Sequence, residues 1–185
     1  MLFKEVGLKG AYLIELEPFR DDRGFFARSW CRREFEAQGL EGRFVQANVS
    51  FNKQRGTLRG MHYQAAPYAE VKLVRCTRGA IYDVIIDLRP ESESFGKWMG
   101  FELTADNYRM VYVPEGFAHG FETLEDSTEV TYQVSEFYNP SSEGGIRYDD
   151  PAFGIRWPEE VRVISRKDMA WPDYRLPPQA ERGGT

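Results

Sequence analysis

The chain contains only two histidines, which makes each of them a candidate for proton-transfer chemistry. His62 lies in the segment RGMHYQ (residues 59–64), and His119 lies in PEGFAHGF (residues 114–121). An imidazole titrates near neutral pH and can act as a general base, although a lone histidine is more often a hydrogen-bonded core residue. Polar residues near His62 favour a functional site over a core position: Arg59, Gln64 and Lys72.

Two histidines on separate strands of a barrel also suggest a metal-binding cupin. Such sites usually combine two or three histidines with a carboxylate. The residue two positions after His62 is Gln64, and a glutamine amide is a poor ligand, so the inward-facing pair of ligands is broken. We therefore expect no metal, and a site built from His62, His119 and one carboxylate stays open as the alternative.

The strand that carries His62 and the strand after it are candidates to line a ligand site. Strand alternation places one set of side chains on a single face: Leu58, Gly60, His62 and Gln64. Gly60 would leave room for a ligand on that face. Lys72 interrupts an apolar run, so its ammonium group either extends to solvent or faces a polar cavity.

Two tyrosines and an aspartate complete the candidates for acid–base chemistry. Tyr132 and Tyr138 lie in TYQVSEFY (residues 131–138), and a tyrosine with an ionisable partner can act as a general acid. Packing against strand neighbours is the simpler alternative for both. Asp168 is by default expected to cap a helix or a turn.

Short strands must position these side chains. Runs rich in β-branched and aromatic residues recur about every ten residues, with turn residues between them. They cover 11–19, 44–51, 57–64, 71–77, 80–88, 97–103, 108–113 and 128–134. This spacing predicts an all-β sandwich or barrel, with one short helix from a Ser29 cap to Gln38 that ends at Gly39.

The turn residues predict how the strands connect. Turns are expected at 20–24, 106–107 and 114–116, and a tight hairpin is expected at Arg78-Gly79. Beyond Ser135 the chain is rich in Pro, Asp and Trp, which indicates a tail packed over one end of the barrel. We expect a single domain over residues 1–185, with 176–185 as a flexible tail.

Composition disfavours several classes of protein. The chain has 185 residues, a net charge of −5 and no basic run, so a nucleic-acid surface is not expected. No apolar stretch suits a membrane span, no signal peptide is expected, and two cysteines cannot form a disulfide scaffold, which together favour the cytoplasm. Nucleotide-binding glycine loops and a serine-hydrolase elbow do not occur, which disfavours hydride transfer, kinase chemistry and serine hydrolysis.

Six motifs follow one another between Ala11 and Asp168. They are DRGFF (22–26), RGTLRGMHYQ (55–64), VKLVR (71–75), FGKW (95–98), PEGFAHGF (114–121) and YDDP (148–151). Each motif is weak alone, but in this order they resemble the dTDP-4-dehydrorhamnose 3,5-epimerase family. The resemblance implies a cupin-type jelly-roll barrel with short peripheral helices, working as a homodimer without a metal or another cofactor.

The resemblance also implies a reaction and a site. The substrate would be a nucleotide-linked 4-keto-6-deoxyhexose, inverted at C3 and C5 on the route to dTDP-L-rhamnose. By match to the family, His62 is the base, Asp168 orients it, Tyr132 is the acid on the opposite sugar face, and Lys72 lies by the C4 oxygen. Residues matched to ligand contacts are Arg23, Gln46, Asn48, Arg59, His119, Tyr138, Glu143 and Lys167, and Phe26 suits stacking on the nucleobase.

Three departures from the family pattern leave alternatives open. Arg28 stands where the family usually has Glu, Ala47 where it often has Asp, and Glu70 where it commonly has Gln. A different nucleobase therefore remains an alternative, as does epimerisation at C3 only or C5 only. A sugar-nucleotide-binding cupin without catalysis is the third alternative, which would have to keep an unused catalytic set.

Overall fold

A computed structural model describes residues 1–175, so the predicted flexible tail at 176–185 lies outside the described residues. Most elements are short strands, and two are short helices. Their bounds are β1 (Leu2–Glu5), β2 (Tyr12–Glu15), β3 (Phe19–Asp21), β4 (Gly24–Phe26), α1 (Arg32–Ala37), β5 (Gln46–Asn52), β6 (Thr57–Gln64), β7 (Lys72–Arg78), β8 (Ala80–Asp87), β9 (Trp98–Thr104), β10 (Met110–Val113), β11 (Phe117–Thr123), β12 (Thr128–Val134), β13 (Glu143–Gly145), β14 (Val163–Ile164) and α2 (Arg166–Met169).

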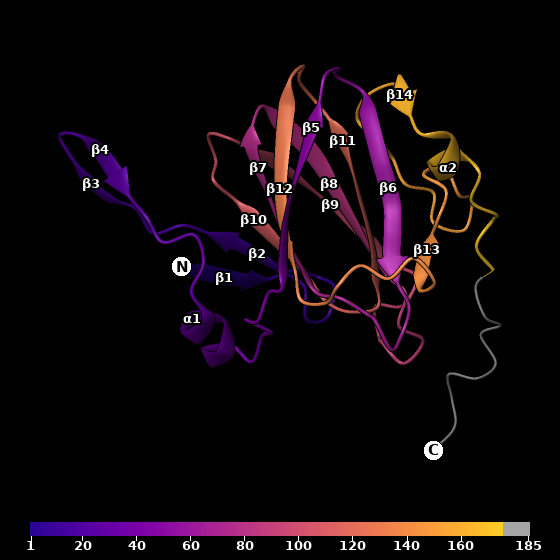
Figure 1. Cartoon of the computed structure of the whole chain (residues 1–185), viewed down its shortest axis with the longest axis horizontal. Helices are drawn as coiled ribbons and strands as arrows, with labels where there is room; N and C mark the ends of the chain where they lie inside the picture. The colour runs from indigo at the N-terminus through magenta and orange to yellow at the C-terminus, as the bar shows by residue number, and fades with distance from the viewer. Residues whose placement is uncertain (176–185) are drawn as a thin grey trace.

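Two sheets face each other and form a jelly-roll barrel (Figure 1). The first sheet has the order β1-β2-β10-β7-β12-β5, and the second has the order β13-β6-β11-β8-β9, with β14 beside β6. Pairing is antiparallel throughout these sheets except between β14 and β6. The predicted all-β class is therefore confirmed.

The predicted hairpin at Arg78-Gly79 is wrong. Strand β7 pairs with β10 and β12, whereas β8 pairs with β9 and β11, so the chain crosses from one sheet to the other at this point. Gly79 has a φ of +73°, and a β carbon there would lie 2.5 Å from Thr128 Oγ1. The glycine that suggested a hairpin instead permits a sharp passage between layers.

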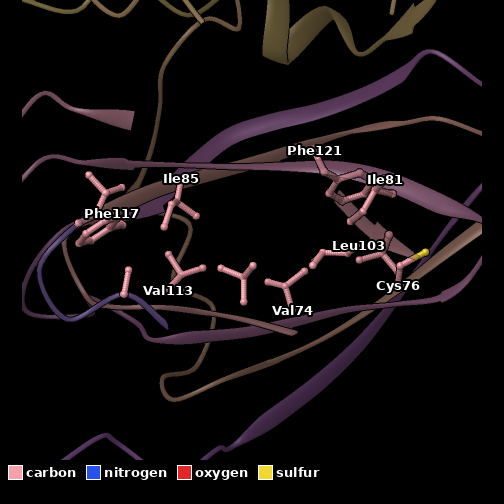
Figure 2. Close-up of a cluster of buried hydrophobic side chains, with 12 residues drawn as sticks. Val74, Cys76, Ile81, Ile85, Leu103, Val113, Phe117 and Phe121 are labelled. Carbon is pink, nitrogen blue, oxygen red and sulfur yellow. The ribbon is translucent and has the colours of Figure 1, made fainter. Parts of the chain in front are cut away.

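The core fills the space between the two sheets. Side chains from the inward faces of both sheets meet there, including Val74 and Cys76 from β7, Ile85 from β8 and Phe117 and Phe121 from β11 (Figure 2). Each large apolar side chain buried in this way contributes about 1.5–3 kcal/mol. This core holds the walls of the barrel at a fixed separation.

The segment after Ser135 covers a face of the barrel and not an end, which corrects the prediction. Ile146 and Phe153 pack against Met61 and Val84, which point outward from the second sheet. The Trp98 indole donates a hydrogen bond to the Phe153 carbonyl at 2.9 Å. This packing brings β14 and α2 back alongside β6 (Figure 1).

The helix and several strands differ from the prediction. Helix α1 begins after Cys31 and not at Ser29, and the Cys31 side chain makes no capping hydrogen bond. Strand 57–64 has the predicted bounds, whereas the predicted run 11–19 is divided between β2 and β3. Strands β1, β4, β11, β13 and β14 were not predicted. Among the described residues, no helix is long and apolar enough to cross a membrane.

Strands β3 and β4 form a hairpin that projects away from the barrel (Figure 1). All of its strand residues are exposed, including Phe19 at 75% and Phe26 at 70%. The predicted turn at 20–24 is the tip of this hairpin. Within one chain, Phe25 of the hairpin packs edge-on against Tyr108, which precedes β10.

A buried carboxyl on β11 makes stability depend on pH. Glu122 is fully buried, and one of its oxygens accepts a hydrogen bond from the Glu159 amide at 3.1 Å. The other oxygen has no hydrogen-bond partner among the described residues. Burial raises the pKa of this carboxyl to about 7, with the charge of Glu159 adding to the rise.

We expect the wild-type protein to lose stability as the pH rises from 4.5 to about 7, and Glu122→Gln to lack this loss. In that window the unfolded chain has released the proton and the folded chain still holds it, so the free energy of unfolding falls as pH rises. The wild-type loss is on the order of 3 kcal/mol. Urea unfolding at pH 5 and pH 8 measures it, with exposed Glu125→Gln as the control. An unchanged wild-type midpoint across this window would contradict the assignment.

Candidate active site

A cavity of about 640 Å³ opens between β5 and β6, at the edge of the first sheet. This volume suits a small-molecule ligand. We call it the main cavity. It is lined by Val49, Ser50, Phe51, Thr57, Leu58, Arg59, His62, Lys72, His119, Phe121, Tyr132, Val163, Ile164, Ser165, Lys167 and Asp168.

His62 and Asp168 form a hydrogen-bonded pair at one wall. His62 Nε2 lies 2.7 Å from Asp168 Oδ1, and Asp168 is buried although the His62 ring is partly exposed. Asp168 is held by the Ser165 hydroxyl, which accepts from the Asp168 amide at 3.0 Å. Burial by itself would raise the pKa of Asp168, but the hydrogen bond and charge of His62 hold it below its ordinary value. Ser165, and not Asp168, therefore caps the short helix.

The structure around Gly60 corrects two predictions: that this glycine leaves room for a ligand, and that simple alternation decides which side chains of β6 share a face. A β carbon at Gly60 would lie 2.6 Å from Gly120 Cα, so the missing side chain admits the neighbouring strand and not a ligand. The register of β6 and β11 shifts between His119 and Phe121. Because this irregularity breaks the alternation, Arg59 and His62 both reach the main cavity.

The opposite wall carries Lys72 and Tyr132, which belong to the first sheet. Lys72 is buried, with 8% of its surface exposed, and its ammonium group contacts the Glu70 carboxylate. The sequence left two alternatives open for Lys72, solvent or a polar cavity, and the structure places it in the cavity wall. Burial raises the pKa of the Tyr132 phenol, the charge of Glu70 raises it further, and Arg59 opposes the rise.

His119, like His62, is hydrogen-bonded to an aspartate, but its ring is buried where that of His62 is partly exposed. Its Nε2 lies 2.7 Å from Asp83 Oδ2, and both residues are buried. Burial raises the pKa of the Asp83 carboxyl, against the opposing charge and hydrogen bond of His119. Within residues 1–175, no three His, Cys, Asp or Glu side chains converge in a way that could hold a metal ion.

A second cavity of about 390 Å³ adjoins the main one and shares His62, Lys72 and Tyr132 with it. We call it the side cavity. It is lined by Gln46, Asn48, Tyr63, Gln64, Glu70, Val134, Tyr138 and Glu143 together with those three residues. At its mouth, the Tyr138 hydroxyl donates to Glu143 at 2.8 Å, and Lys167 Nζ donates to Glu143 at 2.6 Å.

Two of the predicted ligand contacts lie away from both cavities of their own chain. The Arg23 side chain is 90% exposed, and Phe26 is also exposed on the projecting hairpin. The sequence reasoning also missed Val49, Phe51 and Glu70 as lining residues. Glu70 had a usable signal, because it lies two residues before Lys72.

Comparisons with known proteins agree on one family. The family model described as dTDP-4-dehydrorhamnose 3,5-epimerase matches residues 5–175. A protein of that name from Methanothermobacter thermautotrophicus is 44% identical, covering 95% of this chain and 96% of its own length.

Solved structures show the same likeness. A dTDP-4-dehydrorhamnose 3,5-epimerase from Elizabethkingia anophelis superposes with a TM-score of 0.92 at 41% identity, covering 94% of this chain and 96% of its own. A Legionella pneumophila dTDP-6-deoxy-D-glucose-3,5-epimerase in complex with dTDP-4-keto-L-rhamnose superposes with a TM-score of 0.84 at 36% identity. The match covers 95% of this chain and 99% of that one. The fold is thus the cupin-type jelly roll implied by the resemblance. The chain belongs to the dTDP-4-dehydrorhamnose 3,5-epimerase family of isomerases.

Proposed function

We propose that this protein inverts C3 and C5 of dTDP-4-dehydro-6-deoxy-D-glucose to give dTDP-4-dehydro-L-rhamnose. The observation that carries the proposal is one cavity with His62 and Asp168 on one wall and Lys72 and Tyr132 on the other. His62 stands on β6 of the second sheet with Asp168 on α2 beside it, whereas Lys72 and Tyr132 stand on β7 and β12 of the first sheet (Figure 1). Moving protons beside a ketone leaves the oxidation state unchanged, so the reaction needs no redox cofactor.

His62 acts as the base. A hydrogen next to the C4 ketone is acidic because the carbanion delocalises onto oxygen as an enolate. An imidazole can remove such a proton near neutral pH. Asp168 fixes the ring orientation and stabilises the imidazolium that forms, because its low pKa keeps it ionised.

Lys72 stabilises the developing enolate oxygen. Its ammonium group is buried at the cavity wall, where a positive charge interacts strongly with a nearby oxyanion. A single donor to such an oxyanion typically lowers the barrier by about 3–4 kcal/mol. No proton has to leave Lys72 for this role.

Tyr132 returns a proton to the other face of the sugar. It stands on β12 in the first sheet, whereas His62 stands on β6 in the second. Delivery from the opposite side inverts the carbon that His62 deprotonated. The raised pKa of the phenol keeps it protonated, and thus able to donate, at neutral pH. The same pair serves both carbons because both flank the C4 ketone.

Cations in the main cavity suit the nucleotide part of the substrate. Arg59 and Lys167 line the cavity, and Arg59 Nε is oriented by a hydrogen bond of 2.7 Å to Asn52 Oδ1. Guanidinium and ammonium groups bind diphosphate through charge-assisted hydrogen bonds. Gln46, Asn48, Tyr138 and Glu143 in the side cavity are the remaining proposed contacts, with His119 in the main cavity.

We further propose that the protein is a homodimer in which the β3–β4 hairpin serves the partner's cavity. Arg23 matches a ligand contact of the family and Phe26 suits stacking on the nucleobase, yet within one chain both project into solvent. The chain exposes apolar side chains both on the hairpin, at Phe19 and Phe26, and at the cavity rim, at Val49 and Phe51, and a second copy could cover both.

This arrangement predicts two results. Sedimentation should give a species of twice the 21.4 kDa chain mass. Arg23→Ala should raise KM for the dTDP-sugar about tenfold, the usual cost of losing a charge-assisted hydrogen bond, while the dimer persists. Exposed Arg33→Ala on α1 is the matched control. A monomer, or an unchanged KM in Arg23→Ala, would rule the arrangement out.

Trapping the product stereochemistry tests the reaction itself. The protein is incubated with dTDP-4-dehydro-6-deoxy-D-glucose, and borohydride then reduces the ketone before hydrolysis and sugar analysis. Double inversion gives L-rhamnose and 6-deoxy-L-talose. Recovery of D-configured sugars alone would mean that C5 is not inverted and would reject the proposal.

A further inference from the structure

Two glutamates line the side cavity, and their surroundings differ. Glu143 lies at the mouth, where it pairs with Lys167 and the exposed Tyr138. Glu70 pairs with Lys72, and the side chains of both are only 10% exposed. Glu70 is therefore the carboxylate that accompanies the buried ammonium group at the catalytic wall.

The backbone that carries Glu70 is fixed on the end of β12. The Val71 amide donates to the Ser135 hydroxyl at 2.8 Å, and the Ser135 amide donates to the Val71 carbonyl at 3.1 Å. Glu70 thus precedes a residue held at two points. A carboxylate on an anchored backbone can hold its partner in one position, which a carboxylate on a mobile loop cannot do.

A buried ammonium group needs such a partner. Removing a charge from water costs several kcal/mol unless an opposite charge and hydrogen bonds compensate. The other carboxylates near the site are already engaged, because Asp168 pairs with His62 and Glu143 pairs with Lys167. Glu70 supplies the compensation for Lys72.

Glu70 also faces Tyr132, which shares the side cavity with it. A nearby negative charge favours the protonated form of both an ammonium group and a phenol. Of the other charged and titratable groups within residues 1–175, only the charge of Arg59 is seen to lower the pKa of the phenol, and Glu70 opposes it. Besides Glu70, the acidic and basic side chains that share the two cavities with Tyr132 are Arg59 and His62 on β6, Lys72 on β7, His119 on β11, Glu143 on β13, and Lys167 and Asp168 on α2.

We propose that Glu70 is a positioning residue that fixes the ammonium group of Lys72 and sets the alkaline limit of the reaction at Tyr132. This inference rests on the proposed function for its catalytic consequence.

The first test needs no substrate. Lysines are labelled with an amine-reactive reagent, and the rate at Lys72 is followed by mass spectrometry in wild type, Glu70→Gln and Glu70→Asp. Loss of the carboxylate frees the amine, so Lys72 should label several-fold faster in Glu70→Gln and near the wild-type rate in Glu70→Asp. Glu91→Gln, in an exposed turn, is the control for loss of one charge. An equal rate in wild type and Glu70→Gln overturns the positioning role.

The second test is the pH profile of kcat. The alkaline limb should move down by about one pH unit in Glu70→Gln, because a nearby negative charge has gone. Glu70→Asp should restore it, which a merely structural role would not explain. If the alkaline limb of kcat lies at the same pH in Glu70→Gln and in wild type, the proposed effect of Glu70 on Tyr132 is wrong. Failure of the proposed function would look different: wild type itself would turn over no dTDP-sugar, while the labelling rates still decide whether Glu70 holds Lys72.

Discussion

Replacing His62 by alanine is expected to lower proton exchange at C3 and C5 by roughly 10³-fold, the range typical of a lost general base. The change removes the imidazole and leaves Lys72, Tyr132 and Arg59 in place. Binding of the nucleotide-sugar should be nearly intact, because the cationic contacts to the diphosphate remain. Exchange followed by NMR in D2O, and binding followed by calorimetry, separate the two effects.

One result for His62→Ala would contradict the role of His62 as the base. If the variant still exchanges protons at the wild-type rate, the base is another group, and His119 is the remaining imidazole in the main cavity. Loss of binding together with exchange would instead indicate a folding defect. Thermal unfolding of the same preparation, compared with wild type, detects that defect.

Replacing Tyr132 by phenylalanine is expected to separate exchange from inversion. The ring and its packing remain, but the proton donor on the first sheet is lost. His62 can still remove a proton and return it to the same face, so exchange at one carbon should survive better than full inversion. We expect inversion to fall about 10²-fold or more, as for loss of a general acid.

Product stereochemistry measures the Tyr132→Phe effect. Borohydride trapping after incubation in D2O gives the ratio of exchanged to inverted sugar for each carbon. Wild-type stereochemistry in the variant would remove Tyr132 from the acid role. Tyr138→Phe is a useful comparison, because Tyr138 bonds to Glu143 at the mouth and should change KM more than stereochemistry.

Local patterns in the sequence predicted the strands better than their connections. Strand 57–64 has the predicted bounds because its β-branched and aromatic residues, and the turn before it, are local signals. The passage between sheets at Gly79 has the same local signature as a hairpin. Only pairing with distant strands distinguishes the two, and no local pattern encodes that choice.

The site was predictable where residue type alone was informative. Two histidines and a lysine in an apolar run marked His62, His119 and Lys72 without a structure. Asp168 was not separable from a cap by sequence, because it reaches His62 across 106 positions of the chain. Arg59 lines the same cavity as His62 because the register of β6 and β11 shifts between them, and simple strand alternation does not predict this.

Solvent exchange catalysed by the wild-type protein tests the central claim most directly. The protein is incubated with dTDP-4-dehydro-6-deoxy-D-glucose in D2O, and deuterium is located by NMR and mass spectrometry. The account predicts deuterium at both C3 and C5, with both centres inverted. Deuterium at one carbon would contradict double epimerisation, and no exchange with this sugar or its UDP, GDP and CDP counterparts would contradict catalysis by His62 and Tyr132 altogether.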